Sequence, residues 1–245
     1  MVTTPDLAGL IDTAHRIVFF GGAGVSTESG IPDFRSADGI YARPYGRHLT
    51  PEEILSRSFF DADPETFFDF YRTNLVHVDA RPNPAHRALA NLERAGKVSA
   101  VVTQNIDGLH QAAGSKTVWE LHGSIWRNHC RRCGRSFELA HVVEFPGVPR
   151  CPCGGVVKPD VVLYEERLNA AVIDGALDAL ARADLLIVGG TSLSVYPAAS
   201  LIDAFQGSRL VVINRDATFA DTRASLTIRA PIGVTLGAWD VRESK

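Results

Sequence analysis

Short runs of apolar, β-branched residues alternate with segments of helical periodicity along most of the chain. Five of these runs are almost continuously hydrophobic, a pattern typical of strands that are buried on both faces of a parallel sheet. They span residues 16–20, 98–102, 118–121, 184–188 and 209–213. Because helical segments separate the strands, the pattern predicts an α/β fold with a doubly wound parallel sheet.

Several helices are predicted from periodicity and from their first residues. Apolar side chains recur at helical spacing over residues 7–14. Thr50–Glu53 reads as a capping box with Pro at the first helical position. Asp63-Pro64 and Asn83-Pro84 predict two further helix starts.

Two stretches interrupt the alternation of strands and helices. Residues 124–157 contain all the cysteines and little periodicity, which indicates a small inserted module that needs a covalent or metal staple. Residues 31–80 are helical and loop-like, and they form either a lid or a part of that module. The predicted large domain therefore comprises residues 1–30, 81–123 and 158–245, and the predicted small domain comprises residues 31–80 and 124–157.

Composition and charge narrow the classes of protein. The chain has 245 residues, of which 45% are hydrophobic and 22% charged, and its 12 Phe and 3 Trp exclude a mainly disordered protein. It contains no apolar run of about 18 residues, the length that a membrane span needs. Residues 1–10 lack the features of a secretory signal, so we expect a cytoplasmic location. A net charge of −3 gives no long-range attraction to nucleic acid or to an anionic membrane.

The cysteines predict a metal site. The chain contains four, which are Cys130, Cys133, Cys151 and Cys153. In a reducing compartment such close pairs indicate metal binding sooner than disulfides, and four thiolates are the ligand set of a closed structural zinc site. Only one residue separates the second pair, which is tighter than usual, so His129 and His141 remain alternative ligands.

Each predicted strand is followed by a polar or glycine-rich motif. Ligands of open parallel sheets bind outside the carboxyl ends of the strands, so these motifs are the main indication of function. They lie at residues 21–26, 103–107, 122–123, 189–192 and 214–216.

Two of these motifs indicate particular chemistry. Gly22 and Gly24 allow backbone N–H groups to approach a pyrophosphate, but Thr27 stands where a dinucleotide fingerprint has its third glycine. No acidic residue ends a second strand at the spacing that a dehydrogenase needs, which disfavours hydride transfer. His122 at a strand end is a candidate general base, because histidine titrates near neutral pH. No Ser or Cys lies in a nucleophile elbow, so a covalent hydrolase is not expected.

Together these motifs resemble the sirtuin family of NAD-dependent protein deacylases. The resemblance is carried by Gly22–Arg35, Thr103–Asp107, His122-Gly123, the cysteine module and Gly190–Pro197, in the family's order. It implies a Rossmann-like NAD domain and a small zinc-binding and helical domain, with NAD and an acyl-lysine entering between them. The implied activity is NAD-dependent protein-lysine deacetylation that consumes NAD and releases nicotinamide and O-acyl-ADP-ribose. The implied catalytic residues are His122, as the general base, and Asn105.

The resemblance also implies the residues that bind NAD and the peptide. For the NAD cofactor they are Gly22, Ala23, Gly24 and Ser26; Ile31, Asp33, Phe34 and Arg35; Gln104, Asn105, Ile106 and Asp107; Gly190, Thr191 and Ser192; Asn214, Arg215 and Asp216; and Ile232. Acetylated-lysine peptides are expected to add as a strand between two edges of the enzyme. The residues of those edges are Val161, Val162, Tyr164, Val195 and Tyr196.

The sequence departs from the family's pattern beside the peptide. Where the family has Phe-Gly-Glu, this chain has Tyr164-Glu165-Glu166, so a side chain replaces a glycine. Members that prefer acidic acyl groups carry a Tyr and an Arg in the helix after the cofactor loop. Counting back from Pro82-Asn83 places Phe70 and Thr73 at those positions, which favours a neutral acyl group such as acetyl.

Other functions remain open from sequence alone. A mono-ADP-ribosyltransferase would use the same NAD site with another acceptor, and a non-catalytic NAD sensor would need neither His122 nor Asn105. A nucleic-acid-binding zinc ribbon has little support, since Arg131, Arg132 and Arg135 form only a small basic cluster. We therefore expect no nucleic-acid site and no membrane partner, and the sequence does not indicate an oligomeric state.

Overall fold

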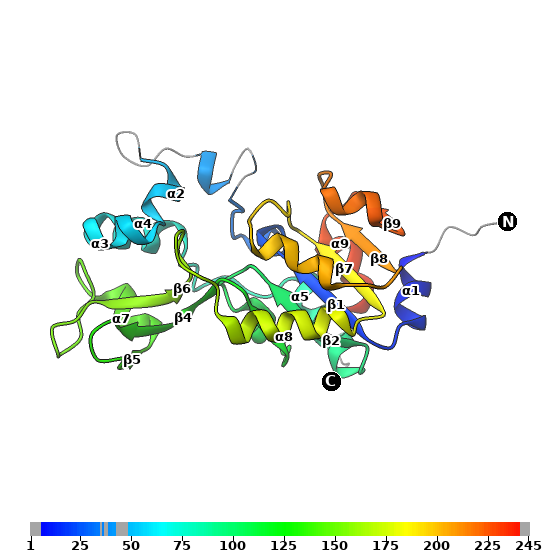
Figure 1. The fold of residues 1–245 in the computed structure, drawn as a ribbon, viewed down its shortest axis with the longest axis horizontal. Helices are drawn as coiled ribbons and strands as arrows, with labels where there is room; N and C mark the ends of the chain where they lie inside the picture. The colour runs from blue at the N-terminus through cyan, green and yellow to red at the C-terminus, as the bar shows by residue number, and fades with distance from the viewer. Residues whose placement is uncertain (1–5, 35, 37–38, 43–48, 241–245) are drawn as a thin grey trace.

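The larger lobe is built on a six-stranded sheet in which every neighbouring pair is parallel. The computed structural model describes residues 6–34, 36, 39–42 and 49–240 (Figure 1). The strand order is β3-β2-β1-β7-β8-β9. β2 and β3 therefore lie on one side of β1, and β7, β8 and β9 lie on the other, so the strand order changes direction between β1 and β7. The strands are β1 Ile17–Gly21, β2 Val98–Thr103, β3 Val118–Glu120, β7 Leu185–Gly189, β8 Leu210–Ile213 and β9 Leu226–Ile228.

All five predicted strands are confirmed, within a residue or two at their ends. Alternate residues of a strand face opposite sides of the sheet, so Ile17 and Phe19 join one hydrophobic core while Val18 and Phe20 join the other. Two covered faces explain why the runs are continuously apolar. β9 was not predicted, because three partly exposed residues are too few to form a recognisable run.

Helices cover both faces of this sheet. α1 Leu7–Thr13, α5 Pro84–Arg94 and α9 Ile232–Leu236 pack on one face, and α8 Ala170–Ala181 packs on the other (Figure 1). α6 Leu109–Ala113 packs beside α5. The 3-10 helices are η1 Ala23–Val25, η2 Thr27–Ser29, η3 Ile40–Ala42, η4 Ala198–Ala204, η5 Phe219–Arg223 and η6 Gly237–Trp239.

The smaller lobe combines the cysteine module with the helical interruption. Its antiparallel sheet has the order β5-β4-β6, with β4 Gly123–Cys130, β5 Ser136–Phe137 and β6 Val157–Val161. Its helices are α2 Pro51–Ile54, α3 Arg57–Ala62, α4 Pro64–Asn74 and α7 Leu139–Glu144. β6 lies in this small sheet, although the predicted domain boundary falls between residues 157 and 158.

One hydrophobic core joins the two parts of the smaller lobe. Phe60, Phe67 and Phe68 of α3 and α4 are fully buried and share this core with Cys130 and Cys151. The aromatic rings meet edge to face, with centroids 4.8 to 5.8 Å apart. For residues 31–80, the sequence predicts either a lid or a part of the cysteine module. The core that α3 and α4 share with the cysteines indicates that these helices are a part of the module.

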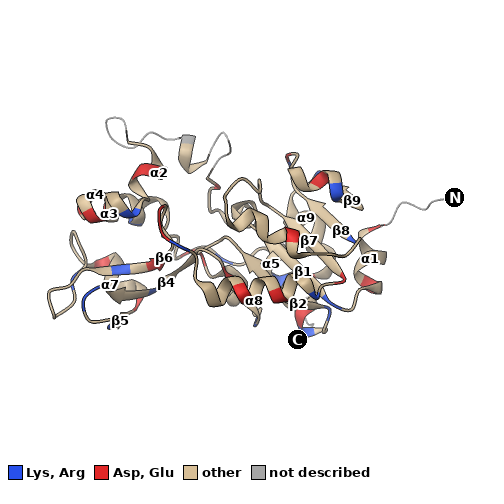
Figure 2. Ribbon diagram, viewed as in Figure 1, with Lys and Arg blue, Asp and Glu red and all other residues tan. Residues whose placement is uncertain are grey.

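Charged residues of both signs are interspersed over both lobes, as Figure 2 shows. This distribution agrees with the small net charge of −3. Among the residues placed by the structure, no helix combines the length and the hydropathy needed to cross a bilayer.

Candidate active site

A pocket of about 420 Å³ lies where the two lobes meet. The large lobe contributes the residues that follow β1, β2, β7 and β8, and the small lobe contributes residues 161–166 and Asn74, Leu75 and His77. The predicted site residues that line it are Ala23, Gly24, Ser26, Ile31, Asp33, Phe34, Gln104, Asn105, Ile106, Asp107, His122, Val161, Val162, Tyr164, Gly190, Thr191, Ser192, Val195, Tyr196, Asn214, Arg215, Asp216 and Ile232. Gly22 does not line this pocket, and Arg35 lies outside the described residues.

The turns after β1 and β7 touch each other backbone to backbone. The Gly24 N–H donates to the Gly190 carbonyl at 2.8 Å. A Cβ on Gly24 would lie 2.8 Å from that same oxygen, and a Cβ on Gly22 would lie 2.9 Å from Thr191 Cβ. These glycines therefore permit close contact between two turns at the point where the sheet changes direction, which is where doubly wound sheets bind ligands.

Ser26, Asn105 and Asp107, which all line the pocket, form a hydrogen-bonded group. Ser26 Oγ donates to Asp107 Oδ2 at 2.6 Å and accepts from Asn105 Nδ2 at 3.0 Å. Asp107 Oδ1 accepts from the Leu109 N–H at 2.8 Å. Burial raises the pKa of Asp107 above its ordinary value, and the hydrogen bonds from Ser26 and Leu109 oppose that shift. The group fixes the β2 turn to the β1 turn.

His122 is oriented by one hydrogen bond to the backbone. Its Nδ1 lies 3.0 Å from the Gln104 carbonyl oxygen, which can only accept, so Nδ1 carries the proton. Burial lowers the pKa of His122, and the bond to Gln104 offsets part of that shift. The imidazole is therefore neutral near neutral pH, with Nε2 as an acceptor that no described residue occupies. A neutral, oriented imidazole at a pocket wall is what a general base requires.

α4 meets the pocket at a different residue from the one predicted. Phe70 is 1% exposed in the core of the small lobe, and Thr73 does not line the pocket. Asn74 lines it instead, one position further along the helix. Arg72 donates to the carbonyls of residues 142, 145 and 147 and so points into the small lobe. The predicted register was wrong, although α4 still presents no cation to the pocket.

The four cysteine sulfur atoms all lie within 4.8 Å of one another. Cys130 Sγ is 3.5 Å from Cys153 Sγ, and Cys133 Sγ is 3.6 Å from Cys151 Sγ. A tetrahedral zinc with Zn–S bonds of about 2.3 Å places its sulfurs roughly 3.8 Å apart, close to these separations. The residues present therefore fit a zinc ion held by four thiolates, and His129 and His141 are not part of the cluster.

Known proteins are similar to most of this chain. The model of the Sir2 family matches residues 22–197. The chain belongs to the Sir2 family. Relatives of this Sir2 chain include an NAD-dependent protein deacetylase of Cutibacterium acnes, which is 57% identical over 97% of each chain. Another, from Clostridium perfringens, has the same name and is 56% identical over 94% of this chain and 96% of the relative.

Solved Sir2 structures share the fold. A complex described as "Sir2-p53 peptide-NAD+" has a TM-score of 0.84 and 36% identity, covering 96% of each chain. A Sir2 homologue in complex with NAD has a TM-score of 0.85 and 39% identity, covering 96% of this chain and 92% of the other. The α/β, Rossmann-like fold and the family predicted from sequence are therefore confirmed for this Sir2 chain.

Sequence reasoning missed two residues that hold the pocket of this Sir2 chain together. Asn83 Nδ2 donates to the Val25 carbonyl at 2.7 Å and to Ser29 Oγ at 3.0 Å, while Asn83 Oδ1 caps α5. Glu28 accepts from the Gly233 N–H at 2.6 Å and so joins η2 to α9. The sequence around Asn83 indicates only a helix start, and no motif signals either long-range contact.

Proposed function

We propose that this Sir2-family chain is an NAD-dependent protein deacetylase that consumes NAD and releases nicotinamide and O-acyl-ADP-ribose. The observation that carries this proposal is the neutral His122, oriented by Gln104 in the pocket at the β1–β7 switch point. The names of relatives that are 57% and 56% identical over nearly their whole length support it.

The lining of the pocket fits NAD. Asn214 to Asp216 and Gly190 to Ser192 offer amide, hydroxyl and backbone groups to a nucleotide, with Ile232 beside them. Ile31, Phe34 and Ile106 offer apolar surface to a planar ring, as ligand pockets commonly do. Bound NAD supplies the bond to nicotinamide whose cleavage drives the reaction, and the ribose that takes up the acyl group.

In the proposed reaction, His122 acts as a base while its neighbours hold their positions. His122 accepts a proton at Nε2 from the hydroxyl that takes up the acyl group, and its Nδ1–H bond to Gln104 keeps Nε2 as the acceptor. Asn105, held by Ser26, contributes the other predicted catalytic side chain. Enclosure between the lobes keeps bulk water away from the reacting atoms.

Substrates are proposed to be peptides or proteins that carry acetyl-lysine. Residues 161–164 and 195–196 face the pocket from two segments, and an extended peptide would add between them by main-chain hydrogen bonds. No cation comes from α4, since Asn74 is neutral and Arg72 is turned away, so a neutral acyl group is preferred.

The zinc has a structural role in this proposal. Cys130 and Cys151 are buried in the core of the small lobe, while the His122 imidazole lies in the pocket wall. Cysteines that form no disulfide and can hold a metal suit a reducing compartment, and we propose the cytoplasm as the place of action.

The test is mass spectrometry of an acetyl-lysine peptide incubated with the protein, with and without NAD. We expect deacetylated peptide, nicotinamide and O-acetyl-ADP-ribose only when NAD is present. ADP-ribosylated protein without deacetylation would instead establish a transferase. NAD binding without turnover, across peptides with several acyl groups, would establish a sensor.

A further inference from the structure

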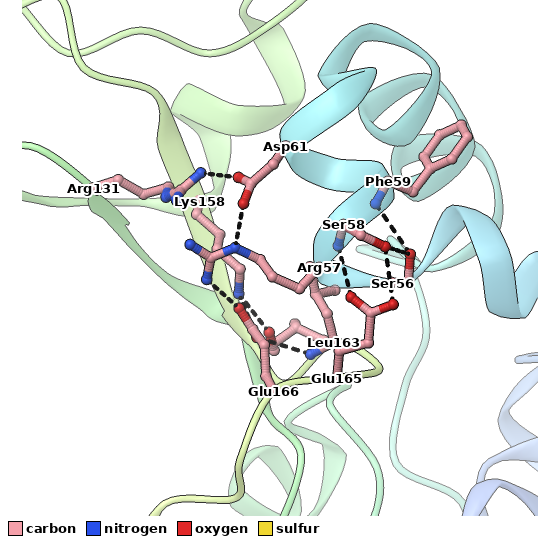
Figure 3. A network of polar contacts seen from close by, with 11 residues as sticks. Ser56, Arg57, Ser58, Phe59, Asp61, Arg131, Lys158, Leu163, Glu165 and Glu166 are labelled. Carbon is pink, nitrogen blue, oxygen red and sulfur yellow. Dashed lines mark hydrogen bonds and ion pairs between the residues drawn. The ribbon is translucent and has the colours of Figure 1, made fainter.

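The segment that follows β6 is held by contacts that the family's Phe-Gly-Glu could not make. Glu165 has a φ of 73°, in the left-handed region that favours glycine. Its carboxylate accepts from the Ser58 N–H and from Ser58 Oγ, both at 2.9 Å (Figure 3). These two hydrogen bonds offset the cost of the left-handed backbone and tie residue 165 to the start of α3.

Backbone and ion-pair contacts fix the residues on either side of Glu165. The Tyr164 N–H donates to the Leu55 carbonyl at 3.0 Å, and the Tyr164 carbonyl accepts from the Arg57 N–H at 3.0 Å. Glu166 pairs with Arg57 at 2.8 Å and with Lys158 at 3.0 Å, as Figure 3 shows. These contacts hold the backbone on both sides of the Tyr164 side chain.

That side chain reaches from the peptide edge to the cofactor side of the pocket. Tyr164 Oη lies 2.7 Å from Tyr41 Oη. Tyr41 packs its ring edge-on against Phe34, with centroids 5.5 Å apart, and its N–H donates to the Phe34 carbonyl at 2.9 Å. Phe34 lines the pocket next to Asp33, among the residues proposed to bind NAD. A phenylalanine in place of Tyr164 would have no hydroxyl with which to touch Tyr41.

We propose that Tyr164 is a positioning residue that couples the two binding sites through its hydroxyl group. A peptide strand added along residues 161–164 orders Tyr164, whose hydroxyl group contacts that of Tyr41. Tyr41 in turn packs against Phe34 in the pocket wall. Because a ligand that orders a shared contact lowers the cost of ordering it for the next ligand, each ligand raises the affinity of the other. This inference rests on the proposed function, since it takes residues 161–164 as the peptide edge.

The experiment measures binding rather than turnover. Isothermal titration gives the Kd of ADP-ribose, which has no nicotinamide to release, with and without a saturating acetyl-lysine peptide. For the wild-type protein we expect the peptide to lower this Kd. Tyr164→Phe should reduce that enhancement by about two- to tenfold, the factor that one hydrogen bond provides. Tyr41→Phe should reduce it equally, and the double variant should lose no more than either single variant.

Tyr71→Phe is the matched control. The Tyr71 hydroxyl is buried in the core of the small lobe without a hydrogen-bond partner, so its removal should leave the coupling as in the wild type. If Tyr164→Phe does not fold, Tyr41→Phe alone tests the same contact.

Three results would overturn the inference. They are an undiminished enhancement in Tyr164→Phe or Tyr41→Phe, additive losses in the double variant, and no enhancement in the wild type. Failure of the proposed function is seen separately, as the absence of NAD-dependent deacetylation by the wild-type protein.

Discussion

The cofactor side and the peptide side of the pocket are built in different ways. On the cofactor side, polar side chains that follow β1 and β2 are buried, with Ser26 1% and Asn105 9% exposed. On the peptide side, Tyr164 is 37% and Tyr196 67% exposed. The first group consists of small buried side chains that follow strands, and the second consists of large exposed side chains on connecting segments. The contrast indicates a fixed site for chemistry beside a more adaptable surface for substrate.

Strand register explains why the cofactor side is fixed. Gly21 pairs with Thr103 of β2 and with Gly189 of β7 in the same sheet. Three parallel strands therefore end at one level, and the turns that follow them meet there. Among the described residues the peptide side has no such ladder, because Ser56 and Tyr164 lie outside the named strands and form an isolated bridge. We expect substitutions on the first side to change rate and those on the second to change preference.

Loss of the metal should produce the largest difference between the two sides, because it should abolish deacetylation and spare cofactor binding. Cys130→Ser removes one of four clustered thiolates, and a structural zinc contributes about 10–16 kcal/mol to the folding of small zinc domains. We expect zinc content to fall, the thermal transition to drop and deacetylation to be lost. ADP-ribose binding should persist, because the six-stranded sheet has its own two cores.

Metal analysis, calorimetry and titration with ADP-ribose check this prediction. Treatment of the wild-type protein with a chelator should reproduce the effect without any substitution. Unchanged zinc content in Cys130→Ser would show that Cys130 is not a ligand.

The next effect concerns catalysis on the cofactor side alone. His122→Ala should lower kcat by about 10²- to 10⁴-fold, the usual contribution of a general base, while the melting temperature and ADP-ribose binding change little. Nicotinamide release measures the rate. The matched control is His15→Ala, an exposed histidine outside the pocket, which should retain full turnover. Wild-type turnover in His122→Ala would exclude the base role.

The sequence alone predicts the residues at the strand ends better than it predicts long-range contacts between side chains. Hydrophobic runs predict strands, and residues after parallel strands converge, so the sequence is enough to place Gly24, Asn105 and His122 close together. The cysteine cluster can also be predicted from the sequence, because its ligands are close together along the chain. Contacts such as that of Asn83 with Val25 cannot be predicted from the sequence, since they depend on the packing of a whole helix against a turn.

The error in α4 has a specific physical cause. One residue turns a helix by about 100°, so counting back across the connection from Pro82 to Asn74 must be correct to the residue. The length of a non-helical connection does not fix that rotation. The core contacts of Phe67 and Phe68 do fix it, and they leave Asn74 facing the pocket.

The smallest effect should appear as a change of acyl preference on the peptide side. Asn74 lines the pocket and donates from Nδ2 to the Phe70 carbonyl at 3.0 Å, so it offers an acidic acyl group no charge. Asn74→Arg places a guanidinium at this position and should raise the ratio of succinyl-lysine to acetyl-lysine kcat/KM about tenfold. The ratio is measured on two peptides that differ only in the acyl group.

Thr73→Arg provides the matched control for this change. Thr73 is exposed on the same helix and does not line the pocket, so an arginine there should leave the ratio unchanged although it adds the same charge to the protein. A shift in Thr73→Arg together with none in Asn74→Arg would restore the register inferred from sequence and contradict the observed rotation of α4. A shift in both would mean that the charge acts through the long-range field of the protein, and that the peptide side lacks a defined acyl-recognising position on α4.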